Sequence, residues 1–179
     1  MKDFLERPVS STRAFAGGFI RVNRDEVLLP NGKRAIREYL LHPGASIIVP
    51  VHEGGRVVMV RQYRHAIGAH VIEFPAGKID PGETGEQAAR RELVEETGYE
   101  AASWERLYRL HPSVASSNEA NEIFLARGLR HVGRREQPDE FLEVIEIPFA
   151  RALEWVRQGE ITDIKAVLCL LYLAGKGKM

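Results

Sequence analysis

The segment 77–99 constrains the fold of this chain more than any other segment. It predicts a helix over 85–97, because Thr84 and Gln87 have the spacing of a capping box at the amino end of a helix. Gly98 stands where a residue with left-handed backbone geometry commonly ends a helix. The start and the end of this helix are therefore both defined, and its side chains can be assigned to faces.

The carboxylates of this helix gather on one face. Glu92 and Glu96 are four residues apart and Glu95 lies beside them, so these side chains project within about one turn of each other. Like charges at this spacing repel, and they occupy the half of the helix where the dipole disfavours acids. An acidic face in contact with water would be enough to explain a Glu-x-x-Glu-Glu pattern by itself. The alternative is a bound cation, which would supply the partner that such a cluster needs.

Carboxylate oxygens select hard cations, and the segment 77–99 contains no histidine or cysteine that would favour zinc. Mg²⁺ keeps several of its waters and shares other positions with phosphate oxygens. We therefore expect a Mg²⁺ site, in which Mn²⁺ can substitute. The substrate is expected to carry phosphate.

The rest of the chain alternates short strands with two further helices. Apolar runs bounded by glycine and proline turns predict the strands. The expected strands are 46–51, 56–62, 107–110, 122–126 and 143–147, and the expected helices are 149–158 and 161–174. Helices that cover a mixed sheet form an α/β or α+β sandwich.

The first forty-odd residues predict a small antiparallel sheet. Strand-like stretches flank Pro30-Asn31-Gly32, a strong turn signal, and form a hairpin that ends near Leu41. One hairpin is marginally stable in water, so it must pack on the main domain or be covered by a second copy of the chain. We expect residues 1–44 to be a β-rich extension, followed by the main domain over 45–179, and from the residues alone both alternatives stay open.

The charge balance of the chain argues against some functions. There are 25 basic and 25 acidic side chains, whereas a general nucleic-acid binder usually has a basic excess. The most apolar stretch, 164–174, is too short to span a membrane and predicts a buried helix. The one cysteine, Cys169, is compatible with a reducing compartment. We therefore expect a cytoplasmic protein with neither a nucleic-acid partner nor a membrane partner.

The segment 77–99 resembles the Nudix box of the Nudix hydrolases at every polar and glycine position. The matching residues are Gly77, Glu83 and the run Arg91-Glu92-Leu93-Val94-Glu95-Glu96-Thr97-Gly98-Tyr99, in which Tyr99 stands where the family usually has an aliphatic residue. The resemblance implies an α/β/α sandwich with a mixed sheet, in which the box forms a loop, a helix and a second loop. The resemblance implies that residues 45–179 form a Nudix hydrolase domain.

The resemblance also implies roles for the residues of the box. Glu92 and Glu96 correspond to the paired metal ligands, and Glu95 and Glu83 to supporting or additional ligands. Arg91 corresponds to the arginine that orients the carboxylates. The backbone carbonyl of Ala76, just before the box, corresponds to another frequent ligand. With this ligand set the resemblance implies about two or three ions per site.

Three segments outside the box resemble the ADP-ribose pyrophosphatase branch, which includes nucleoside diphosphate sugar hydrolases. They are 61–64 with 72–77, 137–144, and the N-terminal extension. The resemblance implies Mg²⁺-dependent hydrolysis of the pyrophosphate bond of ADP-ribose or a related nucleoside diphosphate sugar, which yields a nucleoside monophosphate and a sugar phosphate. It also implies an intertwined homodimer in which the extensions are exchanged and each site uses both chains.

Hydrolysis needs a general base, which the resemblance places on the loop before the strand 143–147. Glu140 is the first candidate, Glu143 the second, and Glu119 in the preceding polar loop the third. The alternative for Glu140 is an acid exposed on a loop. The candidates for substrate contacts are Arg64, Arg61 and Glu73, and Arg37 is a candidate to reach the site of the partner subunit.

One departure from the branch concerns the choice of substrate. ADP-ribose hydrolases typically carry a proline about sixteen residues beyond the last box glycine, where this chain has Val114, with Pro112 two residues earlier. Another nucleotide sugar, or a range of them, is therefore an alternative to ADP-ribose. Two other functions stay open: a Nudix pyrophosphatase that removes damaged nucleoside triphosphates, and a non-catalytic Nudix sensor of nucleotide sugars. The extension argues against the first, and the complete set of box carboxylates against the second.

Overall fold

The computed structural model describes residues 3–135 and 141–177. These residues divide into two compact units. One lies within Met1–Pro43 plus His111–Ala120, and the other lies within Gly44–Leu110 plus Asn121–Met179. The loop 111–120 therefore groups with the N-terminal residues, although it lies far from them in sequence.

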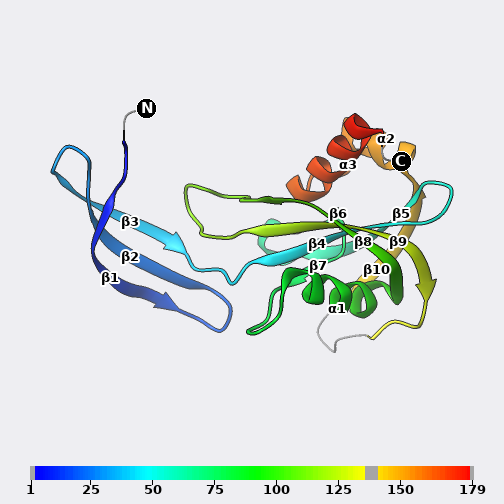
Figure 1. The fold of residues 1–179 in the computed structure, drawn as a ribbon, viewed down its shortest axis with the longest axis horizontal. Helices are drawn as coiled ribbons and strands as arrows, with labels where there is room; N and C mark the ends of the chain where they lie inside the picture. The colour runs from blue at the N-terminus through cyan, green and yellow to red at the C-terminus, as the bar shows by residue number, and fades with distance from the viewer. Residues whose placement is uncertain (1–2, 136–140, 178–179) are drawn as a thin grey trace. The chain divides into compact units, whose positions relative to one another are not determined.

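The first unit is a three-stranded antiparallel sheet made of β1 (Arg7–Ala16), β2 (Arg21–Leu28) and β3 (Arg34–Leu40), in that order (Figure 1). The expected hairpin is the pair β2–β3, and Gly32 in its turn has the positive φ of 80° that favours glycine. β1 is an additional strand, in which every residue is exposed. The loop 111–120 joins this unit through a hydrogen bond of 2.8 Å from the N–H of Leu40 to the carbonyl of Ser116.

The second unit is built on a mixed seven-stranded sheet. The strand order is β10-β5-β4-β9-β8, with β6 beside β5 and β7 beside β4. β4 and β9 are parallel, and the other pairs are antiparallel. The strands are β4 (Ala45–Val51), β5 (Arg56–Arg64), β6 (Ala69–Glu73), β7 (Ala76–Lys78), β8 (Tyr99–Leu110), β9 (Asn121–His131) and β10 (Leu142–Pro148).

Helices cover both faces of this sheet. α1 (Gly85–Thr97) lies on one face, and α2 (Phe149–Gln158) and α3 (Ile164–Lys176) lie on the other, while a short 3₁₀ turn, η1 (His65–Ile67), follows β5 (Figure 1). The expected α/β/α sandwich with a mixed sheet, preceded by a small antiparallel β extension, is confirmed.

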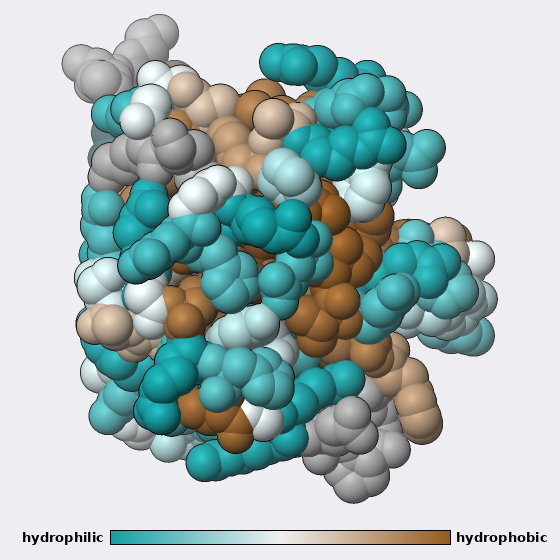
Figure 2. Space-filling view, turned by 90° about the vertical axis from the view of Figure 1, so that its right-hand side faces the viewer, coloured by the Kyte–Doolittle hydropathy of each residue, from teal (hydrophilic) through white to brown (hydrophobic). Residues whose placement is uncertain are grey.

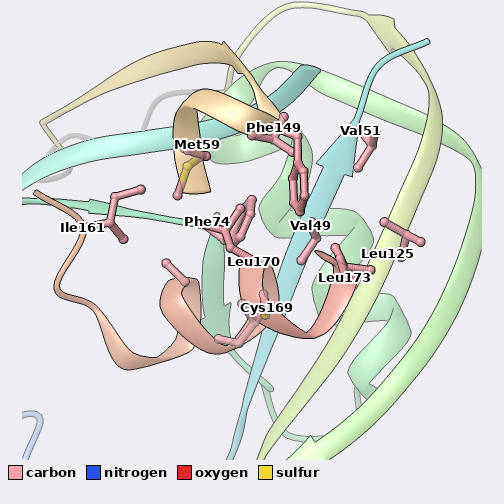
Figure 3. Close-up of a cluster of buried hydrophobic side chains, with 14 of the residues drawn as sticks. Val49, Val51, Met59, Phe74, Leu125, Phe149, Ile161, Cys169, Leu170 and Leu173 are labelled. Carbon is pink, nitrogen blue, oxygen red and sulfur yellow. The ribbon is translucent and has the colours of Figure 1, made fainter. Parts of the chain in front are cut away.

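The core forms as two layers, one on each face of the sheet. β4 is buried along its whole length. Its residues Val49 and Val51 face the helices α2 and α3, where they meet Phe149, Leu170 and Leu173 (Figure 3). The preceding residue, Ile48, packs instead with Leu93 of α1. A strand with helices on both faces needs apolar side chains at consecutive positions, which explains the continuous apolar run in its sequence.

α3 begins at Ile164, three residues later than expected. The carboxylate of Asp163 accepts a hydrogen bond of 2.9 Å from the N–H of Ala166, and this caps the helix. Ile161 lies before the cap and is buried in the core (Figure 3). The apolar pattern starts earlier than the helix because the connection to the helix is itself buried.

Hydrophobic residues also reach the surface. On the face shown in Figure 2 they form separate areas between hydrophilic side chains. Among the described residues, no helix combines the length and the apolar character that a membrane crossing requires.

Candidate active site

The loop–helix–loop around α1 is held by caps at both ends. Thr84 and Gln87 form both hydrogen bonds of a capping box, at 3.2 and 2.8 Å. At the other end Gly98 has a φ of 75° and its N–H donates to the carbonyl of Val94 at 2.9 Å. The helix occupies the expected residues 85–97, so its glutamates are presented from a rigid element.

Gly77 allows α1 to approach the short strand β7 closely. A Cβ atom added at Gly77 would overlap Oε1 and Cδ of Glu92 and would lie 2.5 Å from Oε2. Glycine is required here by the space that the Glu92 carboxylate occupies. The backbone φ of Gly77 is not in the left-handed region, so an alanine could adopt the backbone conformation and only the collision excludes it.

Two glutamates of the helix are buried. Glu92 is 8% exposed and Glu96 is 2% exposed. The N–H of Ala76 donates to Oε2 of Glu96 at 3.2 Å, so this carboxylate is directed toward β7. A carboxylate with so little access to water requires charged or polar partners.

Arg91 lies among the carboxylates of the box. Its Nε and Nη2 donate to Glu83 at 2.9 Å each, and its Nη1 donates to Glu92 at 2.6 Å and to Glu95 at 3.2 Å. Its Nη2 also reaches the carbonyl of Lys78 at 3.0 Å. One planar guanidinium thus connects the loop before the helix with two glutamates of the helix.

These contacts shift two pKa values. Hydrogen bonds from Arg91, with a further one from the backbone N–H of Asp80, lower the pKa of the Glu83 carboxyl to about 2. The hydrogen bonds to Glu83 and then to Glu92 raise the pKa of Arg91. Both groups are therefore charged at neutral pH, and the arrangement is one in which Arg91 could orient the carboxylates.

The donor set fits a hard cation. Within 3–135 and 141–177, no three histidine, cysteine or acidic side chains are already grouped so that they could hold a metal ion. The carboxylates are directed instead to Arg91 and to the N–H of Ala76. The side-chain atoms of this cluster that could ligate a metal are nevertheless all carboxylate oxygens. Three carboxylates share one guanidinium, so the cluster retains negative charge.

A second feature is a bidentate ion pair at the ends of β5 and β6. Arg64 donates to Glu73 through Nε at 2.7 Å and through Nη2 at 2.9 Å. The side chain of Glu73 is 4% exposed, whereas that of Arg64 is 47% exposed. This hydrogen bonding raises the pKa of Arg64, and the charges of Glu96 and Asp163 also contribute. The pair therefore lies within electrostatic range of the box glutamate Glu96.

Two of the remaining candidates pair with each other. Arg61 and Glu143 pair across β5 and β10 at 3.5 Å, with both side chains largely exposed. Glu119 and Arg37 belong to the first unit, where Arg37 forms an ion pair with Glu6 and the carbonyl of Glu119 lies 2.9 Å from Nδ1 of His111. Glu140, the first candidate for the general base, lies outside the described residues.

Lys165 and Asp163 were not singled out from the sequence. The Nζ atom of Lys165 donates to Asp163 and lies 4.0 Å from Oε2 of Glu73. The capping role of Asp163 could have been inferred from its place before a helix, three residues ahead of Ala166. The contact between Lys165 and Glu73 has no local signal, because the two residues lie far apart in sequence.

Known proteins resemble this chain along nearly its whole length. The model of the NUDIX domain matches residues 40–167, and the model of the nucleoside diphosphate sugar hydrolase N-terminal domain matches residues 6–40. The chain is 35% identical to the ADP-ribose pyrophosphatase of Bacillus subtilis (strain 168), over 97% of this chain and 95% of the relative. It is 34% identical to the methanol dehydrogenase activator of Bacillus methanolicus, over 96% of this chain and 94% of the relative.

Two further similarities are more distant or cover less of the chain. The chain is 39% identical to the GDP-mannose pyrophosphatase of Klebsiella pneumoniae, over 76% of this chain and 73% of the relative. A solved structure of an ADP compounds hydrolase shares the fold, with a TM-score of 0.85 and 23% identity over 100% of both chains. The sequence matches, the sandwich fold and the geometry of the box all indicate the same family. The chain belongs to the NUDIX domain family.

Proposed function

We propose that this protein is a pyrophosphohydrolase that cleaves the pyrophosphate bond of ADP-ribose or a related nucleoside diphosphate sugar. The products are a nucleoside monophosphate and a sugar phosphate. The observation that carries the proposal is the box itself, in which Glu92 and Glu96 are buried and face β7. Relatives named ADP-ribose pyrophosphatase and GDP-mannose pyrophosphatase support this substrate class.

The residues of the box are proposed to hold Mg²⁺, for which Mn²⁺ can substitute. Glu92 and Glu96 are the principal ligands, with Glu95, Glu83 and the carbonyl of Ala76 as additional oxygen donors. When bound, the metal neutralises phosphate charge and lowers the pKa of a bound water. Arg91 keeps the carboxylates in place through its hydrogen bonds to Glu83, Glu92 and Glu95.

Arg64 is proposed to bind a phosphate of the substrate. Its Nε and Nη2 are occupied by Glu73. Its Nη1 makes no hydrogen bond to another described residue and belongs to a side chain that is 47% exposed. Glu73 therefore fixes the plane of the guanidinium, and Nη1 can donate to an anion that arrives from solvent. Arg61 is a second candidate cation on the same strand.

The general base is proposed to be Glu140, which must lie within hydrogen-bond reach of the attacking water. Glu143 and Glu119 are the alternatives. Glu143 already pairs with Arg61 at 3.5 Å. That pairing is the reason to keep Glu143 second.

We also propose a homodimer in which the N-terminal extensions, residues 1–44, are exchanged between subunits and Arg37 reaches the partner's site. The first unit supports this proposal because it exposes large apolar side chains, among them Phe15 and Ile36 in its strands and Phe19 between β1 and β2. The Nudix hydrolase domain then comprises residues 45–179. A cytoplasmic location is proposed because the single cysteine is buried and unpaired.

The test is a panel of substrates incubated with the purified protein and Mg²⁺. The panel contains ADP-ribose, GDP-mannose, UDP-glucose, FAD, NADH and the common nucleoside triphosphates, and the products are identified by chromatography. We expect nucleoside monophosphate and sugar phosphate from at least one nucleotide sugar. Faster cleavage of triphosphates would instead favour the nucleotide-sanitising function, and binding without cleavage would favour the sensor.

A further inference from the structure

An array of four charged side chains connects the start of α3 with the ends of β5 and β6. Lys165 donates from Nζ to Oδ1 of Asp163 and lies 4.0 Å from Oε2 of Glu73. Glu73 in turn accepts both hydrogen bonds of the Arg64 fork, at 2.7 and 2.9 Å. The array therefore runs from Asp163 through Lys165 and Glu73 to Arg64.

Burial differs strongly along the array. The side chains of Glu73, Asp163 and Lys165 are 4%, 10% and 22% exposed, whereas that of Arg64 is 47% exposed. A buried carboxylate must be compensated by positive charge, and Glu73 has one cation on each side. The end that faces solvent is the guanidinium of Arg64.

The inner end of the array is fixed by the core. Asp163 caps α3 through the N–H of Ala166 at 2.9 Å. Ala166 itself is fully buried, and it belongs to the same apolar cluster as Phe74, which directly follows Glu73 in the chain. Lys165 is thus held against Glu73 by an element that cannot shift without disturbing that cluster.

We propose that Lys165 is a positioning residue for substrate binding. It holds the Glu73 carboxylate, and Glu73 holds the plane of Arg64 against a phosphate of the substrate. This inference rests on the proposed hydrolysis of nucleotide sugars. Without Lys165 the carboxylate loses one of its two cations, and the fork of Arg64 is no longer held in a single orientation.

The first experiment compares Lys165→Met with Lys176→Met in hydrolysis of ADP-ribose with Mg²⁺. Lys176 is in the last turn of the same helix and lies over the ring of Tyr172, outside the array. We expect Lys165→Met to raise KM about tenfold, as the loss of one charged contact does, and to change kcat by less than about twofold. Lys176→Met should match the wild type, and Lys165→Arg should recover most of the KM. An unchanged KM in Lys165→Met, or no recovery in Lys165→Arg, overturns the proposal.

The second experiment tests whether Lys165 acts through Arg64. If it does, the double variant Lys165→Met/Arg64→Met has the same KM as Arg64→Met alone, because the second change removes nothing further. Additive increases in KM would show that the two residues act independently and would overturn the positioning role. Thermal unfolding of each variant, followed by circular dichroism, confirms that the compared proteins are folded.

The third experiment separates this inference from the proposed function. Binding of inorganic pyrophosphate to the protein without divalent metal is measured by calorimetry for the wild type, Lys165→Met and Lys176→Met. We expect about tenfold weaker binding only in Lys165→Met. If the wild type hydrolyses no nucleotide sugar, the proposed function fails. The loss of pyrophosphate affinity in Lys165→Met would still support the positioning role of Lys165. Equal affinities for pyrophosphate in all three proteins overturn the positioning role of Lys165, even if hydrolysis is normal.

Discussion

Replacement of Gly77 by alanine should separate the position of the Glu92 carboxylate from the stability of the fold. The new methyl group would overlap Oε1 and Cδ of Glu92 and would lie 2.5 Å from Oε2. An ordinary contact needs about 3.4 Å, so the carboxylate must move by at least about 1 Å. Glu92 is buried and held at 2.6 Å by Nη1 of Arg91, so the shift also weakens that charge-assisted hydrogen bond.

A displacement of about 1 Å at a catalytic group can lower a rate by about 10²-fold. We therefore expect Gly77→Ala to lower kcat by about 10²-fold and to raise the Mg²⁺ concentration that gives half-maximal activity. The free energy of unfolding should fall by only about 1–3 kcal/mol, the usual cost of overpacking, since the backbone of Gly77 suits alanine. This corresponds to a decrease in Tm of several degrees.

The assay is steady-state hydrolysis of ADP-ribose over a range of Mg²⁺ concentrations, with Tm measured on the same samples. Gly175→Ala is the matched control, because a Cβ at Gly175 in α3 would meet no atom within 4 Å. Wild-type kcat and wild-type Mg²⁺ dependence in a folded Gly77→Ala protein would refute the steric argument. Equal losses of activity in both variants would refute it as well.

Four other results are expected. Glu96→Gln should abolish most hydrolysis at an unchanged Tm, and full activity would rule out its role as a ligand. Glu140→Gln should lower kcat by orders of magnitude, whereas a change confined to KM would direct attention to Glu143. Sedimentation should show a dimer, and an active monomer would contradict exchange of the extensions. The hydrogen bond to Glu146 raises the pKa of Tyr99 from 10.0 to about 12, so its contribution to stability is complete below pH 10 and is lost as the pH rises through about 12. Tyrosinate absorbance compared with Tyr99→Phe measures this, and ionisation near pH 10 would contradict it.

Local signals allowed the prediction of the box helix and the sandwich. The limits of α1 at 85 and 97 were correct because Thr84 and Gly98 act on their own neighbours. The strand β4 was recognisable because both of its faces are covered, which demands a continuous apolar run. The hairpin β2–β3 was recognisable from its turn residues.

Features that depend on distant pairing could not be predicted. β1 is exposed along its length, so it has no alternation of apolar and polar residues to reveal it. Arg64 and Glu73 were both candidates, but the register of β5 and β6 places Arg64 opposite Ala69 and Glu73 opposite Val60, so nothing in the strand pairing announces their ion pair. Lys165 remained unnoticed because its contact with Glu73 requires α3 to pack on the sheet.

The parallel pairing of β4 with β9 has a consequence for the order in which the protein folds. Ala45 lies opposite Asn121, so this pair closes a long loop that contains α1 and the strands β5 to β8. α1 can form early from its own caps, whereas closure of so long a loop is slow. The residues that surround Glu92 and Glu96 are all in place only after β7 has paired with β4. A divalent cation should therefore slow unfolding of the finished domain and leave the early steps of folding unchanged.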